Sequence, residues 1–215
     1  TDSLAHDIRS PLGRLRRNLD AARAETDPDA RLALLDRADA EAEAVLATTS
    51  AMLELSRVEA GVAAEQFAPV DLAALMRDIA ELYEAAAEAQ GVVLTWKATP
   101  AVVMGHRQLL GEAVANLVDN ALRHGDEGGV LDMRVEDGAG GAPEIVVADR
   151  GRGVPPEDRE RALGRFVRLD ASRAGGGAGL GLALAAAVAR LHGAVLTLED
   201  GRPGLVARFR FPSEA

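Results

Sequence analysis

The sequence contains no cysteine and a single lysine, Lys97. The absence of cysteine excludes a disulfide framework, a thiolate metal site and a cysteine nucleophile, and it is compatible with a reducing compartment. Lys97 belongs neither to a GxxxxGK(S/T) phosphate loop nor to a VAIK motif, and no HRD loop is present. Walker-type NTPases and eukaryotic-type protein kinases are therefore excluded.

Long apolar runs and concentrated basic charge are also missing. In the C-terminal half, the longest stretch free of charged and strongly polar residues is 180–189, roughly half of the ~20 residues that span a bilayer. The net charge is −10 and the basic residues are scattered, which disfavours binding to a nucleic-acid backbone. Since 48% of the residues are hydrophobic, a core is nevertheless expected. We expect a folded fragment without nucleic-acid or membrane contacts of its own.

The first 62 residues are predicted to form a helical hairpin, because they lack strand-like alternation and have turn signals at residues 26–29 and Gly61. Apolar residues recur at helical spacing at Leu4, Ile8, Leu12, Leu15, Leu19 and Ala22, and again at Leu32, Leu35, Ala42, Val45, Thr49, Met52 and Val58. One apolar stripe per helix gives too small a core for independent stability. We therefore expect a homodimer in which two hairpins form a four-helix bundle.

From Phe67 onward, helical and strand patterns alternate. Helices are predicted at 71–90, 107–124 and 180–192, and strands at 92–98, 130–136, 144–148, 194–199 and 205–211. The glycine-rich residues 138–141 are predicted to connect two strands, and a long Gly/Arg/Pro loop precedes the last helix. The predicted fold class is α+β, with the antiparallel helical hairpin followed by an α/β sandwich whose helices cover one face of a mixed sheet.

His6 lies roughly 170° around the first helix from the apolar stripe and is predicted to face solvent. Asp7 is adjacent in sequence, and Ser10 falls on the same face. A carboxylate at one imidazole nitrogen leaves the other nitrogen as a nucleophile. Pro11 cannot donate to the carbonyl of Asp7, so a kink beside His6 is expected. Taken alone, this stretch favours His6 as an ordinary surface residue, and the other motifs must support a catalytic role.

Polar side chains occupy every fourth position around the stretch ANLVDNALRHG, residues 115–125. Glu112, Asn116, Asn120 and His124 fall on one face of the predicted helix. Asparagine is a poor helix former, so two of them one turn apart indicate a specific role. Amide oxygens suit a Mg²⁺ ion that is already neutralised by phosphates. A solvated polar face is the alternative.

Two glycine-rich stretches complete the pattern. In EIVVADRGRGVPPED, an apolar strand ends in Asp149, which could accept a hydrogen bond from adenine, and Gly151 and Gly153 allow a tight turn. In GGGAGLGLALAAAVARLHG, a glycine loop leads into a helix, an arrangement that binds anions through free amide groups. The glycines at 177, 179 and 181 follow GxGxG spacing, which disfavours a Rossmann turn. A plain turn and a flexible loop without ligand are the alternatives.

In this order the motifs resemble those of two-component sensor histidine kinases over essentially the whole chain. HDIRSPL is similar to the H box, NLVDNA to the N box, DRGRGVP to the G1 box, RFVRLDASR to the F box and GAGLGL to the G2 box. The resemblance implies a dimerisation and histidine-phosphotransfer hairpin at 1–66 and a Bergerat-fold ATP-binding domain at 67–215. It further implies the cytoplasmic part of a membrane-anchored sensor.

The resemblance also implies roles for individual residues. His6 would be the phosphoacceptor and Asp7 the base that polarises it, while Ser10 stands where relatives with strong phosphatase activity commonly have Thr, Asn or Gln. Asn120, with Asn116, would hold Mg²⁺. The implied nucleotide contacts are Arg123 by the phosphates, His124 by the base, Asp149 at adenine, Gly151 and Gly153 around the adenine pocket, and Gly177, Gly179, Leu180 and Gly181 at the phosphates. In a lid at 154–178, Phe166 would be the anchor and Arg168 would reach the γ-phosphate.

The implied activity is Mg²⁺-dependent autophosphorylation by ATP, followed by transfer to a response-regulator aspartate. Two rival functions share the fold. A Bergerat-fold ATPase needs no histidine helix, but it needs a glutamate base four residues before the metal asparagine, where this chain has Asn116. A non-catalytic dimeric scaffold would not need Asn120, Asp149 and the glycines, so ATP affinity distinguishes it from the kinase.

Overall fold

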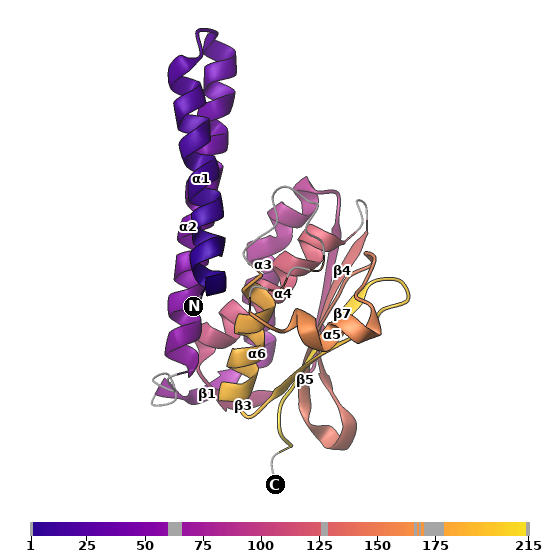
Figure 1. The fold of residues 1–215 in the computed structure, drawn as a ribbon. Coiled ribbons are helices and arrows are strands. Elements are labelled where there is room, and N and C mark those ends of the chain that lie inside the picture. Colours follow the sequence, from indigo (N-terminus) through magenta and orange to yellow (C-terminus); the bar gives the residue numbers. More distant parts are fainter. Residues whose placement is uncertain are drawn as a thin grey trace.

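The structure is a computed structural model that describes residues 2–59, 66–125, 129–165, 167, 169 and 179–213. Two long helices, α1 (Asp2–Ala24) and α2 (Pro28–Glu59), form the expected antiparallel hairpin, which stands beside the rest of the molecule (Figure 1). Arg14 donates to both carboxylate oxygens of Glu41, at 2.7 and 2.9 Å, and so connects the two helices. The helix α1 continues through Pro11, so the proline does not end it.

The second part of the chain is built on a five-stranded mixed sheet in the order β2-β4-β5-β7-β6. The strands are β2 (Val93–Ala98), β4 (Val130–Asp137), β5 (Pro143–Ala148), β6 (Val195–Asp200) and β7 (Leu205–Arg210). Only the pairing of β2 with β4 is parallel, and a short 3-10 turn, η2 (Ala139–Gly141), connects β4 to β5 as expected. The helices α3 (Leu72–Ala89), α4 (Arg107–His124) and α6 (Gly181–Leu191) lie on one face of the sheet (Figure 1). This is the predicted α+β fold class.

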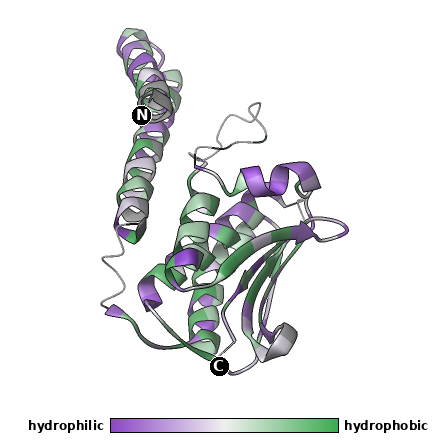
Figure 2. Cartoon of the chain, turned by 60° about the horizontal axis from the view of Figure 1, so that its bottom comes forward, coloured by the Kyte–Doolittle hydropathy of each residue, from purple (hydrophilic) through white to green (hydrophobic). Residues whose placement is uncertain are grey.

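Successive side chains of each strand point to opposite faces of the sheet, one toward the core and the other toward the outer face. Ile145 and Val147 of β5 pack in the core with Met133, Phe209 and the apolar sides of α4 and α6. Figure 2 shows this apolar interior between the helices and the sheet. Val146 points to the opposite face, yet it is fully buried. Its cross-strand neighbours there are Arg134 and Arg208, whose long stems can cover an apolar side chain.

Three elements were not predicted. The strands β1 (Ala68–Asp71) and β3 (Val102–Gly105) pair only with each other, as a separate antiparallel ribbon. The helix α5 (Pro156–Ala162) lies where the sequence indicated a loop. Its sequence supports a short helix, because Pro156 stands at the first helical position. The acidic residues of the first turn also stabilise the helix, since they lie at the positive end of its dipole.

An ion-pair network on the outer face of the sheet should contribute to stability. The Glu144 carboxylate is 2% exposed and accepts from Arg208 at 2.6 Å and Arg210 at 2.5 Å, and these two guanidinium groups lower its pKa against the opposing effect of burial. Arg208 also donates to Glu136 and Glu199. We expect Glu144→Gln, which keeps the shape but removes the charge, to lower the free energy of unfolding by about 1–3 kcal/mol in urea titrations.

Glu199→Gln is the matched control, because the Glu199 side chain is 43% exposed and contacts the same Arg208. Exposed ion pairs contribute little, so this variant should change the free energy of unfolding by less than ~1 kcal/mol. Equal effects of the two substitutions would show that burial of Glu144 does not matter.

Candidate functional site

The polar face of α4 carries both asparagines. The opposite face of the helix packs in the core through Leu110, Leu117 and Ala121. Asn116 uses its Nδ2 to donate to the carbonyl of Glu112, at 2.8 Å. Its other amide atom, Oδ1, lies against Gly181 at the start of α6, where an added Cβ would sit only 2.7 Å away. The stretches ANLVDNALRHG and GGGAGLGLALAAAVARLHG therefore meet at this point.

Asp149 is held rigidly at the end of β5. It is 8% exposed, and its Oδ1 accepts from the backbone amides of Gly151, at 2.8 Å, and Leu205, at 3.2 Å. Its own backbone amide donates to the carbonyl of Leu205. A carboxylate that is already fixed by two amides is ready to bind a donor group without further ordering.

Glycine is required where the loop after Asp149 passes α4. A Cβ at Gly151 would overlap the carbonyl oxygen of His124, and a Cβ at Gly204 would overlap the carbonyl oxygen of Asp149. Gly153 has a φ of +68°, and a Cβ there would lie 2.7 Å from the carbonyl oxygen of Gly204. The G1-like loop is therefore packed directly between the end of α4 and the turn before β7.

These contacts bring three distant segments to one end of the helical layer. A small cavity lies there, lined by Val92, Ala121, Gly125, Gly129, Val130, Leu131, Asp149 and Arg150. Ala121 and Gly125 link this cavity to the C-terminal end of α4, the helix that also carries the asparagines. Polar groups from the loop after β5 and from the start of α6 therefore pack on one helix.

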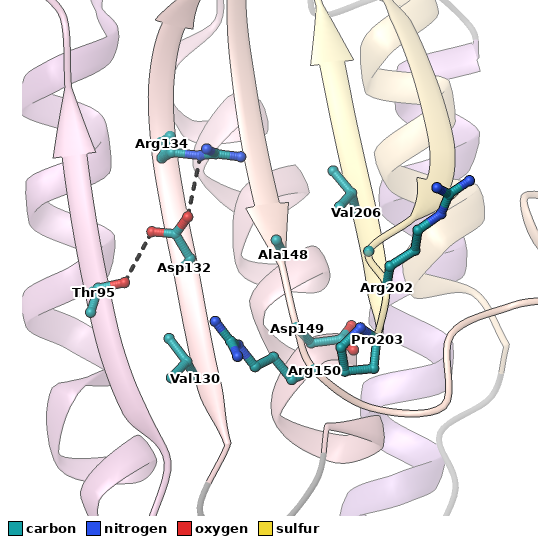
Figure 3. A pocket seen from close by; sticks show the side chains of 11 residues that line it. Thr95, Val130, Asp132, Arg134, Ala148, Asp149, Arg150, Arg202, Pro203 and Val206 are labelled. Atoms are coloured by element: carbon teal, nitrogen blue, oxygen red, sulfur yellow. Dashed lines mark hydrogen bonds and ion pairs between the residues drawn. The ribbon is translucent and has the colours of Figure 1, made fainter.

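Another hollow, of about 410 Å³, lies on the opposite, helix-free face of the sheet (Figure 3). Its wall includes a chain of contacts in which Thr95 donates to Asp132 and Asp132 pairs with Arg134. Among the predicted site residues that the structure describes, Asp149 alone borders it. We place the candidate site on the helical side, because Asn116 and Gly181 meet there.

The remaining predicted residues are distributed as follows. Arg123 and His124 are exposed at the end of α4, and Gly179, with a φ of +69°, precedes α6. Leu180 is 2% exposed and belongs to the hydrophobic core, so only its backbone can face a ligand. For His6, Asp7 and Ser10, only the course of α1 is described. Phe166, Arg168 and Gly177 lie outside the described residues.

Sequence reasoning missed Gly204 and Leu205, which position Asp149 from the adjacent strand. The GRPG stretch at 201–204 is a turn signal, but its pairing with the loop after β5 depends on the order of strands in the sheet. In the described part of the chain, no group of three or more His, Asp or Glu residues is placed to hold a metal ion. Within that same part, no helix combines the length and apolarity needed to cross a bilayer.

Comparison with known proteins places this geometry in a family. Residues 105–215 match the family of histidine kinase-, DNA gyrase B- and HSP90-like ATPases. The chain is 34% identical over 204 residues to the sensor protein kinase PmrB of Pseudomonas aeruginosa, covering 95% of this chain and 43% of that protein. It is 35% identical over 209 residues to the histidine-protein kinase/phosphatase MprB of Mycolicibacterium smegmatis, covering 93% and 41%. The chain thus spans less than half of both relatives.

Solved structures agree with these matches. A mycobacterial sensor histidine kinase MprB is 29% identical, with a TM-score of 0.59, over 68% of this chain and 97% of that one. Full-length ShkA, solved in complex with AMPPNP, is 26% identical, with a TM-score of 0.71, over 98% of this chain and 45% of that one. The likeness to ShkA extends over the hairpin as well as the sandwich.

Proposed function

Because the chain belongs to the histidine kinase-, DNA gyrase B- and HSP90-like ATPases, and among them to the two-component sensor histidine kinases, we propose that it phosphorylates its own His6 with ATP. The phosphoryl group then passes to an aspartate of a response regulator. The observation that carries the proposal is that two of the motif segments pack on the same helix α4, with Gly181 against Asn116 and the loop after Asp149 against His124. The family supplies the ATP-binding function of this domain.

The residues present fit a nucleotide with its metal. Asp149 would accept a hydrogen bond from the adenine amine, while Gly151 and Gly153 keep the loop close enough to α4 to shape the pocket. Asn116 and Asn120 would hold Mg²⁺ through neutral amide oxygens, which suit an ion that is also bound to phosphates. When bound, ATP supplies the γ-phosphoryl group and Mg²⁺ offsets the negative charge on its phosphates.

The chain's own residues would supply positioning and charge compensation. Backbone amides at Gly179 and Gly181, at the start of α6, would face the phosphates, and Arg123 at the end of α4 would lie beside them. At the acceptor, Asp7 would hydrogen-bond one nitrogen of His6 and so leave the other as the nucleophile. Phe166, Arg168 and Gly177 complete the proposal as parts of a lid over the nucleotide.

A division at residue 66 matches these two roles. Residues 1–66 would form the phosphotransfer hairpin and residues 67–215 the catalytic domain. The hairpin exposes a set of large apolar side chains: Leu12, Leu19, Leu32, Leu35, Leu46 and Leu53. Covering them with a second copy would produce the four-helix bundle, so we assign the chain as a homodimer. The response regulator would dock on the bundle near His6.

The rival functions fit the structure less well. An ATPase of this fold needs a carboxylate base where the chain has Asn116, and a neutral amide cannot accept a proton from water. A scaffold would not need Asp149 to be held by two amides. Incubation with radiolabelled ATP and Mg²⁺ tests the proposal directly. A base-stable, acid-labile product indicates phosphohistidine, whereas phosphate release without protein labelling would favour the ATPase.

We expect Asn120→Ala to remove the Mg²⁺ dependence of ATP binding. The Asn120 amide makes no hydrogen bond within the described part of the chain, so its loss should leave the helix intact. Titration of a fluorescent ATP analogue with and without Mg²⁺ measures the effect. Gln108→Ala is the control, because Gln108 is exposed at the opposite end of the same helix. If ATP binding by Asn120→Ala still depended on Mg²⁺ as in wild type, Asn120 would not be a ligand of the metal ion.

A further inference from the structure

A buried histidine ends the helix α6. His192 is 7% exposed, and its Nδ1 lies 2.8 Å from the carbonyl oxygen of Val188. Its Nε2 lies 2.9 Å from the backbone nitrogen of His106. A carbonyl only accepts and an amide only donates, so His192 must be neutral, with its proton on Nδ1. Burial lowers the pKa of His192, which favours this neutral form.

A second histidine begins the helix α4. His106 is the N-cap residue, and its Nδ1 accepts from the backbone amide of Leu109, at 3.4 Å. Its Nε2 lies 2.9 Å from Oε1 of Gln66, to which it can donate once Nδ1 serves as acceptor. His106 therefore links the two ends of one chain of hydrogen bonds, since its ring contacts Gln66 and its backbone amide donates to His192.

The same histidines hold the segment that joins the hairpin to the sandwich. Phe67, next to Gln66, stacks on the ring of His192 with a centroid distance of 4.7 Å and an interplanar angle of 16°. Gly105 leaves room for this ring, since a Cβ there would lie 2.7 Å from it. Near the end of α2, Val58 is buried in the common core. Gln66 and Phe67, which we call the junction, thus contact the sandwich through a hydrogen bond and an aromatic stack.

The two helices held in this way are those that carry the candidate site. His106 starts α4, which bears Asn116 and Asn120 further along, and His192 ends α6, which starts at Gly181. The junction is therefore attached to both helices at the ends remote from the nucleotide. Phosphoryl transfer between the domains requires the catalytic domain to reach His6 on α1. The contacts of Gln66 and Phe67 influence the orientation in which it can do so.

We propose that His106 and His192 are positioning residues for the autophosphorylation of His6, acting through Gln66 and Phe67. This inference rests on the proposed kinase function. It concerns the transfer step and not nucleotide binding, because neither imidazole lies at the nucleotide end of its helix. Loss of the junction contacts should therefore lower kcat and leave the KM for ATP unchanged.

Two single substitutions remove the same hydrogen bond from its two ends. Gln66→Ala removes the acceptor, and His106→Asn keeps an N-cap acceptor for α4 but cannot reach Gln66. We expect each to lower kcat for autophosphorylation at least ~5-fold, to leave the KM for ATP within ~2-fold, and to act non-additively when combined, because both break one contact. Gln90→Ala, an exposed glutamine at the end of α3, is the control and should match wild type.

A second readout does not depend on kinase activity. In hydrogen-exchange mass spectrometry on the same chain, peptides containing Gln66 and Phe67 should exchange faster in Gln66→Ala and His106→Asn than in wild type or Gln90→Ala. Faster exchange with unchanged kcat would overturn the inference, as would unchanged exchange or a loss confined to KM. If the wild type binds ATP but labels no histidine, the proposed function fails, while exchange still reports whether the histidines hold the junction.

Discussion

Gly151→Ala is expected to abolish ATP binding. The added Cβ would overlap the carbonyl oxygen of His124, and neither atom can be moved by rotating a side chain. The loop must then withdraw from α4, and the Gly151 amide would lose its hydrogen bond to Asp149. Because this amide helps to fix the carboxylate proposed to bind adenine, we expect the dissociation constant for ATP to rise by about 100-fold or more.

A fluorescent ATP analogue measures this loss, and urea denaturation checks that the variant is folded. Gly111→Ala provides the matched control, since Gly111 lies on α4 and a Cβ there would make ordinary contact with Leu75 at 3.6 Å. Alanine also favours a helix more than glycine does, so this variant should bind ATP as well as wild type. Wild-type affinity in a folded Gly151→Ala variant would show that this loop does not shape the pocket.

Local periodicity was sufficient to predict the longer elements of the fold. The helix α4 begins at Arg107 and ends at His124 as predicted, because apolar residues repeat along one face and Gly125 follows. The strands β1 and β3 were missed because each has four residues and they are stable only through pairing with each other. That pairing joins segments about 30 residues apart, and a pattern within a few neighbouring residues does not reveal such a contact.

The candidate site was predictable in its residue types but not in its geometry. Asp149 was identified from its place at the end of a strand. Its hydrogen bond from Leu205 depends on the pairing of β5 with β7, which no motif specifies. Leu180 stays a prediction for its backbone alone, because its side chain packs in the core. A motif therefore indicates which residues lie near the candidate site, and the packing of the fold decides which of their atoms can contact a ligand.

His6→Ala is expected to abolish autophosphorylation completely. The phosphoryl group needs a nucleophile with a free lone pair, and alanine supplies none. ATP binding should remain within ~2-fold of wild type, because the candidate nucleotide site lies in the sandwich and not on α1. Incubation with radiolabelled ATP, together with a parallel binding titration, separates the two steps.

The other three histidines make this experiment decisive. His106 and His192 are engaged at the junction through their ring nitrogens, so neither offers a free lone pair to a phosphoryl group. His124 stands at the end of α4, beside the proposed nucleotide, where it would contact the base. Mass spectrometry of the labelled wild-type protein should therefore find phosphate on His6 alone. Label that persists in His6→Ala, or that maps to His106, His124 or His192, would refute the assignment of the phosphoacceptor.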